Sequence, residues 1–144
     1  MTNVLIIGAV GQIPAILIPR LQAEPTLKLP LFGSDAANLP YDNVTKVSGD
    51  ASRIDDLIEV MQNQDTVYMN FDNLAITKLV IEAMHETGVK RIIQAGFLGV
   101  YGEVAEPFAP WNARMTGGVV AANRGNEALE ASDLDYTYAD DLVV

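Results

Sequence analysis

Short apolar segments alternate with amphipathic helical segments along most of the chain. Residues 4–7 form an unbroken apolar run, which is typical of a strand buried on both faces in a parallel sheet. The same reasoning predicts further strands at 27–32, 44–47, 66–69, 91–94 and 134–139, with helices at 12–23, after Ser52, from about 76 to Gly88, and at 123–131. The alternation predicts an α/β fold, a doubly wound parallel sheet in three layers, with residues 1–144 forming a single domain.

Three positions test this pattern. Pro19 lies near the middle of the first predicted helix, where it removes a hydrogen bond at a cost of about 3 kcal/mol, so that the helix either kinks or ends early. Pro30 lies inside the second predicted strand, which is tolerable at a sheet edge and awkward at its centre. Ser52 is the expected N-cap of the second helix, with Asp55 three residues later.

The first strand is followed at once by two glycines, Gly8 and Gly11. Glycines here permit a tight turn and a close approach of the backbone to a ligand, and the N–H groups of the next helix favour a pyrophosphate. The third small residue usual in a dinucleotide fold is replaced by Pro14. The turn therefore predicts a nucleotide cofactor, the alternative being an ordinary strand-to-helix connection.

Charge and composition exclude several other functions. Nine basic and nineteen acidic residues give a formal net charge of −10, which repels phosphate backbones, so no nucleic-acid partner is expected. The chain has no cysteine and one histidine, His85, so no metal site is predicted. No apolar stretch approaches the roughly 20 residues that span a bilayer. We expect a cytoplasmic protein with no membrane partner.

Five motifs follow one another along the chain: VLIIGAVGQI, VSGDAS, VYMN, GVKRIIQ and LEASDLDYT. With these motifs the chain resembles the atypical short-chain dehydrogenases/reductases, NAD(P)-binding Rossmann-fold proteins that include nitrogen-regulator-like sensors. The resemblance implies NAD or NADP as cofactor and, with strands numbered along the chain, the sheet order 3-2-1-4-5-6.

The resemblance also implies which residues contact the cofactor. It places Asp50 and Ala51 beside the adenine, and Asn70 and Phe71 beside the ribose on the nicotinamide side. The residues expected around the pyrophosphate are Gly8, Ala9, Gly11, Gln12 and Ile13. Asp50 could instead be a strand-end cap or turn former, and Asn70 could be an ordinary turn residue.

The chain departs from family members that prefer NADP after its second strand. Those members carry an arginine there, which grips the 2′-phosphate, whereas this chain has Ser34 and Asp35. Asp35 would accept a hydrogen bond from a 2′-hydroxyl and repel a phosphate, which favours NAD weakly. The alternative is that the pair caps a short turn before Ala36.

The catalytic pair of the wider family is also missing. That pair is a tyrosine followed four residues later by a lysine, and none of the five tyrosines here has such a lysine. The chain ends soon after its DYT motif, so the substrate region is truncated relative to the family, and no catalytic residue is predicted. We expect an NAD(P)-binding oxidoreductase-like protein. The alternatives are a non-catalytic dinucleotide-binding sensor or interaction module, or a scaffold that binds no dinucleotide.

The segment 96–118 is rich in glycine, proline and aromatic residues. Its Tyr101, Trp111 and Arg114 are candidates for a pocket wall or a phosphate contact. The favoured alternatives are that Tyr101 packs under the segment, Trp111 anchors it to the body of the domain and Arg114 is a solvent-exposed surface residue. We expect a homodimer with this segment or residues 142–144 at the interface, the alternative being a monomer whose segment covers its own cleft.

Overall fold

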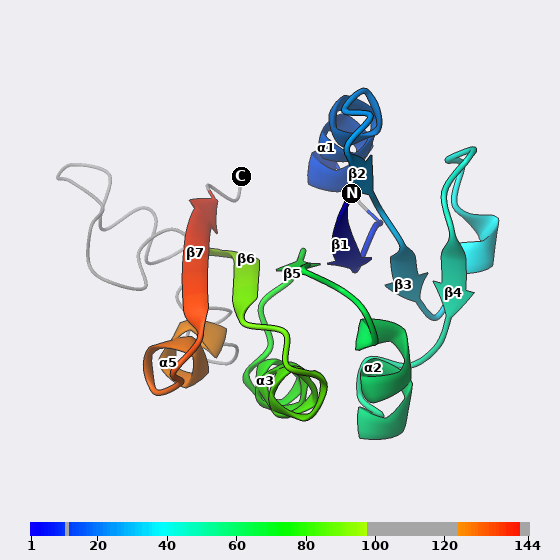
Figure 1. The fold of residues 1–144 in the computed structure, drawn as a ribbon. Helices are drawn as coiled ribbons and strands as arrows, with labels where there is room; N and C mark the ends of the chain where they lie inside the picture. The colour runs from blue at the N-terminus through cyan, green and yellow to red at the C-terminus, as the bar shows by residue number, and fades with distance from the viewer. Residues whose placement is uncertain (11, 98–123, 142–144) are drawn as a thin grey trace, which may run out of the picture.

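The computed structural model describes residues 1–10, 12–97 and 124–141. They form a parallel sheet of seven strands in the order β4-β3-β1-β5-β6-β7, with β2 pairing β1 beside this path (Figure 1). The strands are β1 (Thr2–Ile7), β2 (Leu27–Lys28), β3 (Leu31–Gly33), β4 (Lys46–Ser48), β5 (Thr66–Met69), β6 (Arg91–Phe97) and β7 (Asp135–Asp141).

The predicted order 3-2-1-4-5-6 is confirmed, but the second predicted strand is split in two. Its first piece, β2, pairs with the start of β1, and its second piece, β3, pairs with Ile6 and Ile7. The break falls at Pro30, whose carbonyl still accepts a hydrogen bond from the Ile6 amide at 2.9 Å. Proline has no N–H to donate, so the interior strand is interrupted there and resumes at Leu31, whose amide reaches the Thr45 carbonyl at 2.9 Å.

The helices lie on the two faces of the sheet, which gives three layers (Figure 1). Among the helices of the described residues, α1 lies on one face and α2, α3 and α5 lie on the other. They are α1 (Gln12–Gln22), α2 (Ile54–Met61), α3 (Leu74–Thr87) and α5 (Gly125–Glu130), with a short 3-10 helix, η1 (Ala36–Asn38).

Each face of the sheet has its own apolar core, and β1 contributes to both because successive side chains point to opposite faces. Leu5 and Ile7 belong to the core beneath α2 and α3, and Ile6 belongs to the core beneath α1. All three are at most 1% exposed. The apolar run at 4–7 is therefore buried on both sides, as its sequence predicts.

The helix ends agree only in part with prediction. Of the two alternatives for Pro19, a kink or an early end, the early end is excluded, since the helix continues to Gln22 with an exposed Pro19 inside it. Gly88 does end α3, in a left-handed conformation with φ 78°. The prediction that Ser52 caps the second helix is wrong: Arg53 is the N-cap of α2 without a side-chain bond, because Ser52 is bonded to Asp50.

Candidate functional site

The turn after β1 depends on a glycine for two separate reasons. Gly8 has φ 81°, a left-handed backbone conformation that residues other than glycine rarely adopt. A Cβ atom on Gly8 would also lie 2.8 Å from Cδ1 of Phe71, closer than carbon atoms approach. The Gly8 amide donates to the carbonyl of Phe32 at 3.3 Å, which ties the turn to the end of β3.

A cavity of about 270 Å³ opens beside this turn, at the carboxyl ends of β1, β3 and β4. Ligands of doubly wound folds bind at this edge of the sheet. The residues of the cavity wall that the sequence predicted are Gly8, Ala9, Ser34, Asp35, Asp50, Ala51 and Phe71. Segments that are distant in sequence are thus brought to one site.

Two of the predicted site residues, Asn70 and Ile13, are not in this wall. Asn70 lies at the end of β5, where its Oδ1 accepts a hydrogen bond from the Tyr68 hydroxyl at 2.8 Å. Ile13 is on α1 and is 38% exposed. Gln12 is the first residue of α1, and Gly11 lies outside the described residues.

Sequence reasoning missed part of the wall. Val10, Phe32, Gly33, Gly49 and Ile76 also line the cavity, as do Ala36, Leu39 and Ser52. Phe32 and Gly33 could have been found, because they are the last residues of a predicted strand on the ligand side. Ile76 could not, since it belongs to the apolar face of α3 and its sequence spacing indicates only a core residue.

The Asp50 carboxylate is held in a turn of its own loop. Its Oδ1 accepts hydrogen bonds from the Ser52 amide at 2.8 Å and from the Ser52 hydroxyl at 2.6 Å. These two bonds, with a smaller contribution from the charge of Arg53, hold the pKa of Asp50 below its ordinary value. Asp50 is therefore an ionised acceptor at the cavity wall and a turn former at the same time.

Asp35 and Ser34 lie where the resemblance places the group that reads the adenosine ribose. Asp35 precedes η1, and its Oδ1 accepts from the Asn38 side-chain amide at 2.6 Å. Ser34 is exposed. Together with Asp50, Asp35 gives the cavity wall two carboxylates.

A larger cavity, of about 770 Å³, lies at the opposite edge of the sheet. Its wall contains Asn3 at the start of β1, residues 27–30, residues 43–45 and Gln64, and it contains no glycine. It also includes Gln22, the last residue of α1, where the helix dipole is negative. Of the two cavities, the smaller one is lined by the Gly8 turn that follows β1 and precedes α1, and the larger one is not.

The other candidate side chains are less informative. His85 Nε2 lies 2.9 Å from Oδ1 of Asp133, and both side chains are largely exposed, as expected for a surface pair. Tyr101, Trp111 and Arg114 lie outside the described residues. Within those residues, no three acidic or histidine side chains are grouped to hold a metal ion. In the same part of the chain, no helix has the length and apolar character needed to cross a membrane.

The sheet order, the glycine turn and the cavity at the carboxyl edge define a Rossmann-type fold of the kind that binds dinucleotides. The sequence model described as NAD(P)H-binding matches residues 8–140. The chain belongs to this NAD(P)H-binding family, and its fold is shared with solved short-chain dehydrogenases/reductases.

Solved structures agree with this assignment. A short-chain dehydrogenase/reductase from Veillonella parvula, solved in complex with NADP, has a TM-score of 0.86 and 21% identity over 95% of this chain and 67% of its own. A Rossmann-fold NAD(P)-binding family protein from Shigella flexneri has a TM-score of 0.72 and 35% identity, over 96% and 66%.

An oxidoreductase from Lactococcus lactis has a TM-score of 0.81 and 16% identity, over 96% of this chain and 68% of its own. The chain thus spans about two thirds of the length of these proteins. The comparison with curated proteins gives no match.

Proposed function

We propose that the chain is a single NAD(P)-binding domain that takes the cofactor at the carboxyl edge of its sheet. The observation that carries the proposal is the Gly8 turn, which leads from a buried strand into α1 and forms one wall of the cavity. The first turn of α1 contains no acidic residue, so nothing there opposes the attraction between the helix N-terminus and a pyrophosphate.

The dimensions of the cavity indicate which part of a dinucleotide it would take. At about 270 Å³ it is too small for a whole dinucleotide and is suited to the adenosine part. Ala51 and Ile76 supply apolar surface for the adenine, and Asp50 supplies an ionised acceptor for its amino group. The pyrophosphate would then lie over Gly8 and Ala9, and the nicotinamide end would extend towards Phe71 and Asn70.

As an activity we propose hydride transfer. A bound nicotinamide cofactor would supply the hydride, and the protein would bind and orient the cofactor. Membership of the NAD(P)H-binding family and the oxidoreductase fold support this function. The alternative is a cofactor-binding sensor or interaction module without turnover. The absence of a tyrosine with a lysine four residues later favours that alternative.

A weak preference for NAD over NADP belongs to the same proposal. Asp35 and Asp50 are the charged residues of the cavity wall, and both are acidic. A 2′-phosphate placed beside Asp35 would meet a carboxylate and not a guanidinium. Homodimerisation and a cytoplasmic location also remain predictions, and the segments expected at the dimer interface lie largely outside the described residues.

Titration of the purified chain with NADH and with NADPH, followed by the cofactor fluorescence, tests the proposal. We expect saturable binding of both cofactors, tighter for NADH. A screen of carbonyl substrates in the presence of the reduced cofactor then separates the two alternatives. An enzyme would oxidise the cofactor when a suitable carbonyl is added, and a sensor would not. Absence of saturable binding for both cofactors would contradict the proposed function.

A further inference from the structure

A cluster of polar side chains is buried behind the cofactor turn, between β5, β6, α3 and α5. Asp72 is 6% exposed, and Thr77 and Gln94 are fully buried. Asp72 follows β5, Thr77 is in the first turn of α3, and Gln94 is on β6. Neither the sequence motifs nor the cofactor site assigns a role to these residues.

The Asp72 carboxylate is surrounded by hydrogen-bond donors. Oδ1 accepts from the Gly125 amide at 2.6 Å and from Gln94 Nε2 at 3.4 Å, and Oδ2 accepts from the Tyr138 hydroxyl at 2.5 Å. Among the described residues it has no ion pair with a basic side chain. Burying a carboxylate costs free energy unless hydrogen-bond donors compensate the lost hydration. These bonds therefore fix the positions of the carboxylate and of its three donors.

Two glycines make room for this arrangement. A Cβ on Gly125 would lie 2.5 Å from Asp72 Oδ1, and a Cβ on Gly96 would lie 1.9 Å from Cζ of the Tyr138 ring. Tyr138 therefore passes over β6 at the one residue without a side chain and reaches the carboxylate beyond it. The cluster ties β7 and α5 to the end of β5.

Gln94 extends the cluster to the cofactor turn. Its Nε2 donates to the Phe71 carbonyl at 3.1 Å and lies 3.2 Å from the Thr77 hydroxyl. The ring of Phe71 occupies the space that a side chain on Gly8 would need, and both residues line the cofactor cavity. A continuous series of contacts thus runs from Tyr138 through Asp72, Gln94 and Phe71 to Gly8.

We propose that Gln94, Asp72 and Tyr138 are positioning residues for the dinucleotide: they hold Phe71 in place, and Phe71 supports the Gly8 turn on which the pyrophosphate would lie. This inference rests on the proposed cofactor function. None of the three side chains needs to touch the cofactor, because the effect passes through the main chain and ring of Phe71.

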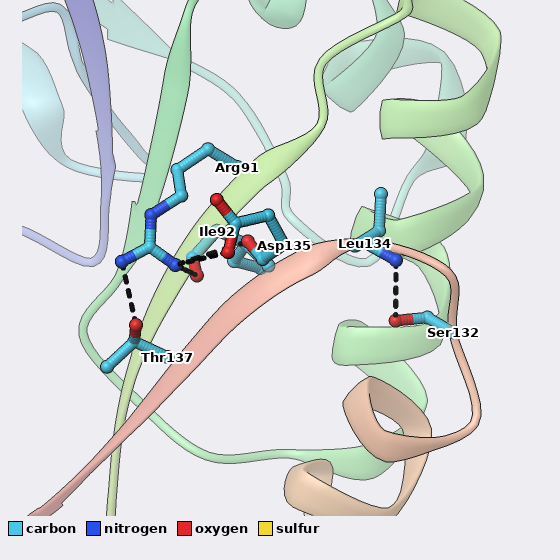
Figure 2. A network of polar contacts seen from close by, with 6 residues as sticks. All are labelled: Arg91, Ile92, Ser132, Leu134, Asp135 and Thr137. Carbon is cyan, nitrogen blue, oxygen red and sulfur yellow. Dashed lines mark hydrogen bonds and ion pairs between the residues drawn. The ribbon is translucent and has the colours of Figure 1, made fainter.

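Two variants test the proposal, and a third serves as a control. Gln94→Leu removes the bond to the Phe71 carbonyl, and Tyr138→Phe removes one donor to Asp72 with little change in packing. The control is Thr137→Val, on the residue next to Tyr138. Thr137 accepts a 2.7 Å bond from Arg91 (Figure 2), on the opposite face of the sheet because neighbouring strand residues alternate.

The first measurement needs no cofactor. The amide resonances of Gly8 and Phe71 in the unliganded protein report the position of the Phe71 ring. We expect both resonances to shift in Gln94→Leu and in Tyr138→Phe and to stay in place in Thr137→Val. If they stay in place in both test variants, the cluster is only a structural support and the proposal is wrong.

The second measurement is the Kd for NADH, taken well below the unfolding midpoint of each variant so that a lower stability alone cannot change it. We expect the Kd to be about tenfold higher for Gln94→Leu and about threefold higher for Tyr138→Phe, and to be unchanged for the control. Should Gln94→Leu fail to fold, Tyr138→Phe alone decides the outcome.

Values within experimental error of the unchanged chain for both variants would overturn the proposal while leaving the proposed function intact. If the unchanged chain does not bind NADH, the proposed function fails first and the claim about affinity falls with it.

Discussion

The two halves of the sheet's carboxyl edge are built in opposite ways. At the ends of β1, β3 and β4 the chain presents glycines, alanines and short polar residues around an open cavity. Level with the end of β5, it presents Asp72 after that strand, Gln94 in the middle of β6 and Tyr138 in the middle of β7. Hydrogen bonds join Asp72 to the other two, and Asp72 and Gln94 are buried while Tyr138 is partly buried. The open cavity lies where the side chains are small, and the packing is rigid where polar side chains form hydrogen bonds with one another.

The halves meet where the ring of Phe71 lies against Gly8. A substitution in the first half should therefore change ligand binding directly. A substitution in the second half should act through stability and through the position of Phe71. The following experiments test this division.

We expect the largest effect from Gly8→Ala. The new Cβ would be 2.8 Å from the Phe71 ring on a residue with φ 81°. Left-handed strain of about 1 kcal/mol and overpacking of about 1 kcal/mol should lower the free energy of unfolding by about 2 kcal/mol and abolish NADH binding. Denaturant unfolding measures the first effect and fluorescence titration the second. Gly33→Ala is the control for stability, since no atom lies within 4 Å of its Cβ position; equal destabilisation by both would contradict the account.

Gly125→Ala should have the next largest effect, in a direction opposite to the usual one. Replacing a helical glycine by alanine ordinarily stabilises a helix by up to about 1 kcal/mol. Here the Cβ would lie 2.5 Å from Asp72 Oδ1, so we expect a net loss of about 1–2 kcal/mol on thermal unfolding. A stabilised variant would show that the packing around Asp72 yields easily and that the second half of the edge is not rigid.

Asp35→Ala should change cofactor preference more than stability. Asp35 lines the cavity and has an exposed side chain. Its removal should lower the ratio of the Kd for NADPH to the Kd for NADH by about fivefold, which weakens or reverses the preference for NADH. Asn38→Ala is the matched control, because it removes the partner of Asp35 and keeps the carboxylate. An unchanged ratio in Asp35→Ala would mean that this carboxylate does not face the ribose.

The smallest effect concerns the surface pair of His85 and Asp133. The hydrogen bond from His85 holds the pKa of Asp133 below its ordinary value of 3.8. A lowered pKa in the folded state stabilises the protein above the unfolded pKa, and this stabilisation is lost as the pH falls through the folded pKa. The difference in unfolding midpoint between the unchanged chain and Asp133→Asn should therefore be present at pH 5 and shrink as the pH falls through the lowered pKa of Asp133. A difference that grows on acidification would refute this sign.

Sequence predicted the first half of the edge much better than the second. Consecutive residues around Gly8 carry the strand, the turn and the helix, so a local pattern suffices. The Asp72 cluster joins residues 72, 94, 125 and 138, which come from one loop and three elements, and no local sequence period marks them. The unbroken strand predicted at 27–32 and the Ser52 cap were wrong for a related reason. Whether an interior strand breaks at a proline, and whether Ser52 bonds to Asp50, depends on neighbours in space.

The most direct test of the account is an amide chemical-shift map of the whole chain titrated with NADH. Binding at the carboxyl edge should shift the resonances of Gly8, Ala9, Ser34 and Asp50, and those of Leu27, Thr45 and Gln64 at the opposite cavity should not move. Shifts confined to the second group, or no shifts at saturating NADH, would contradict the assignment of the cofactor to the Gly8 turn.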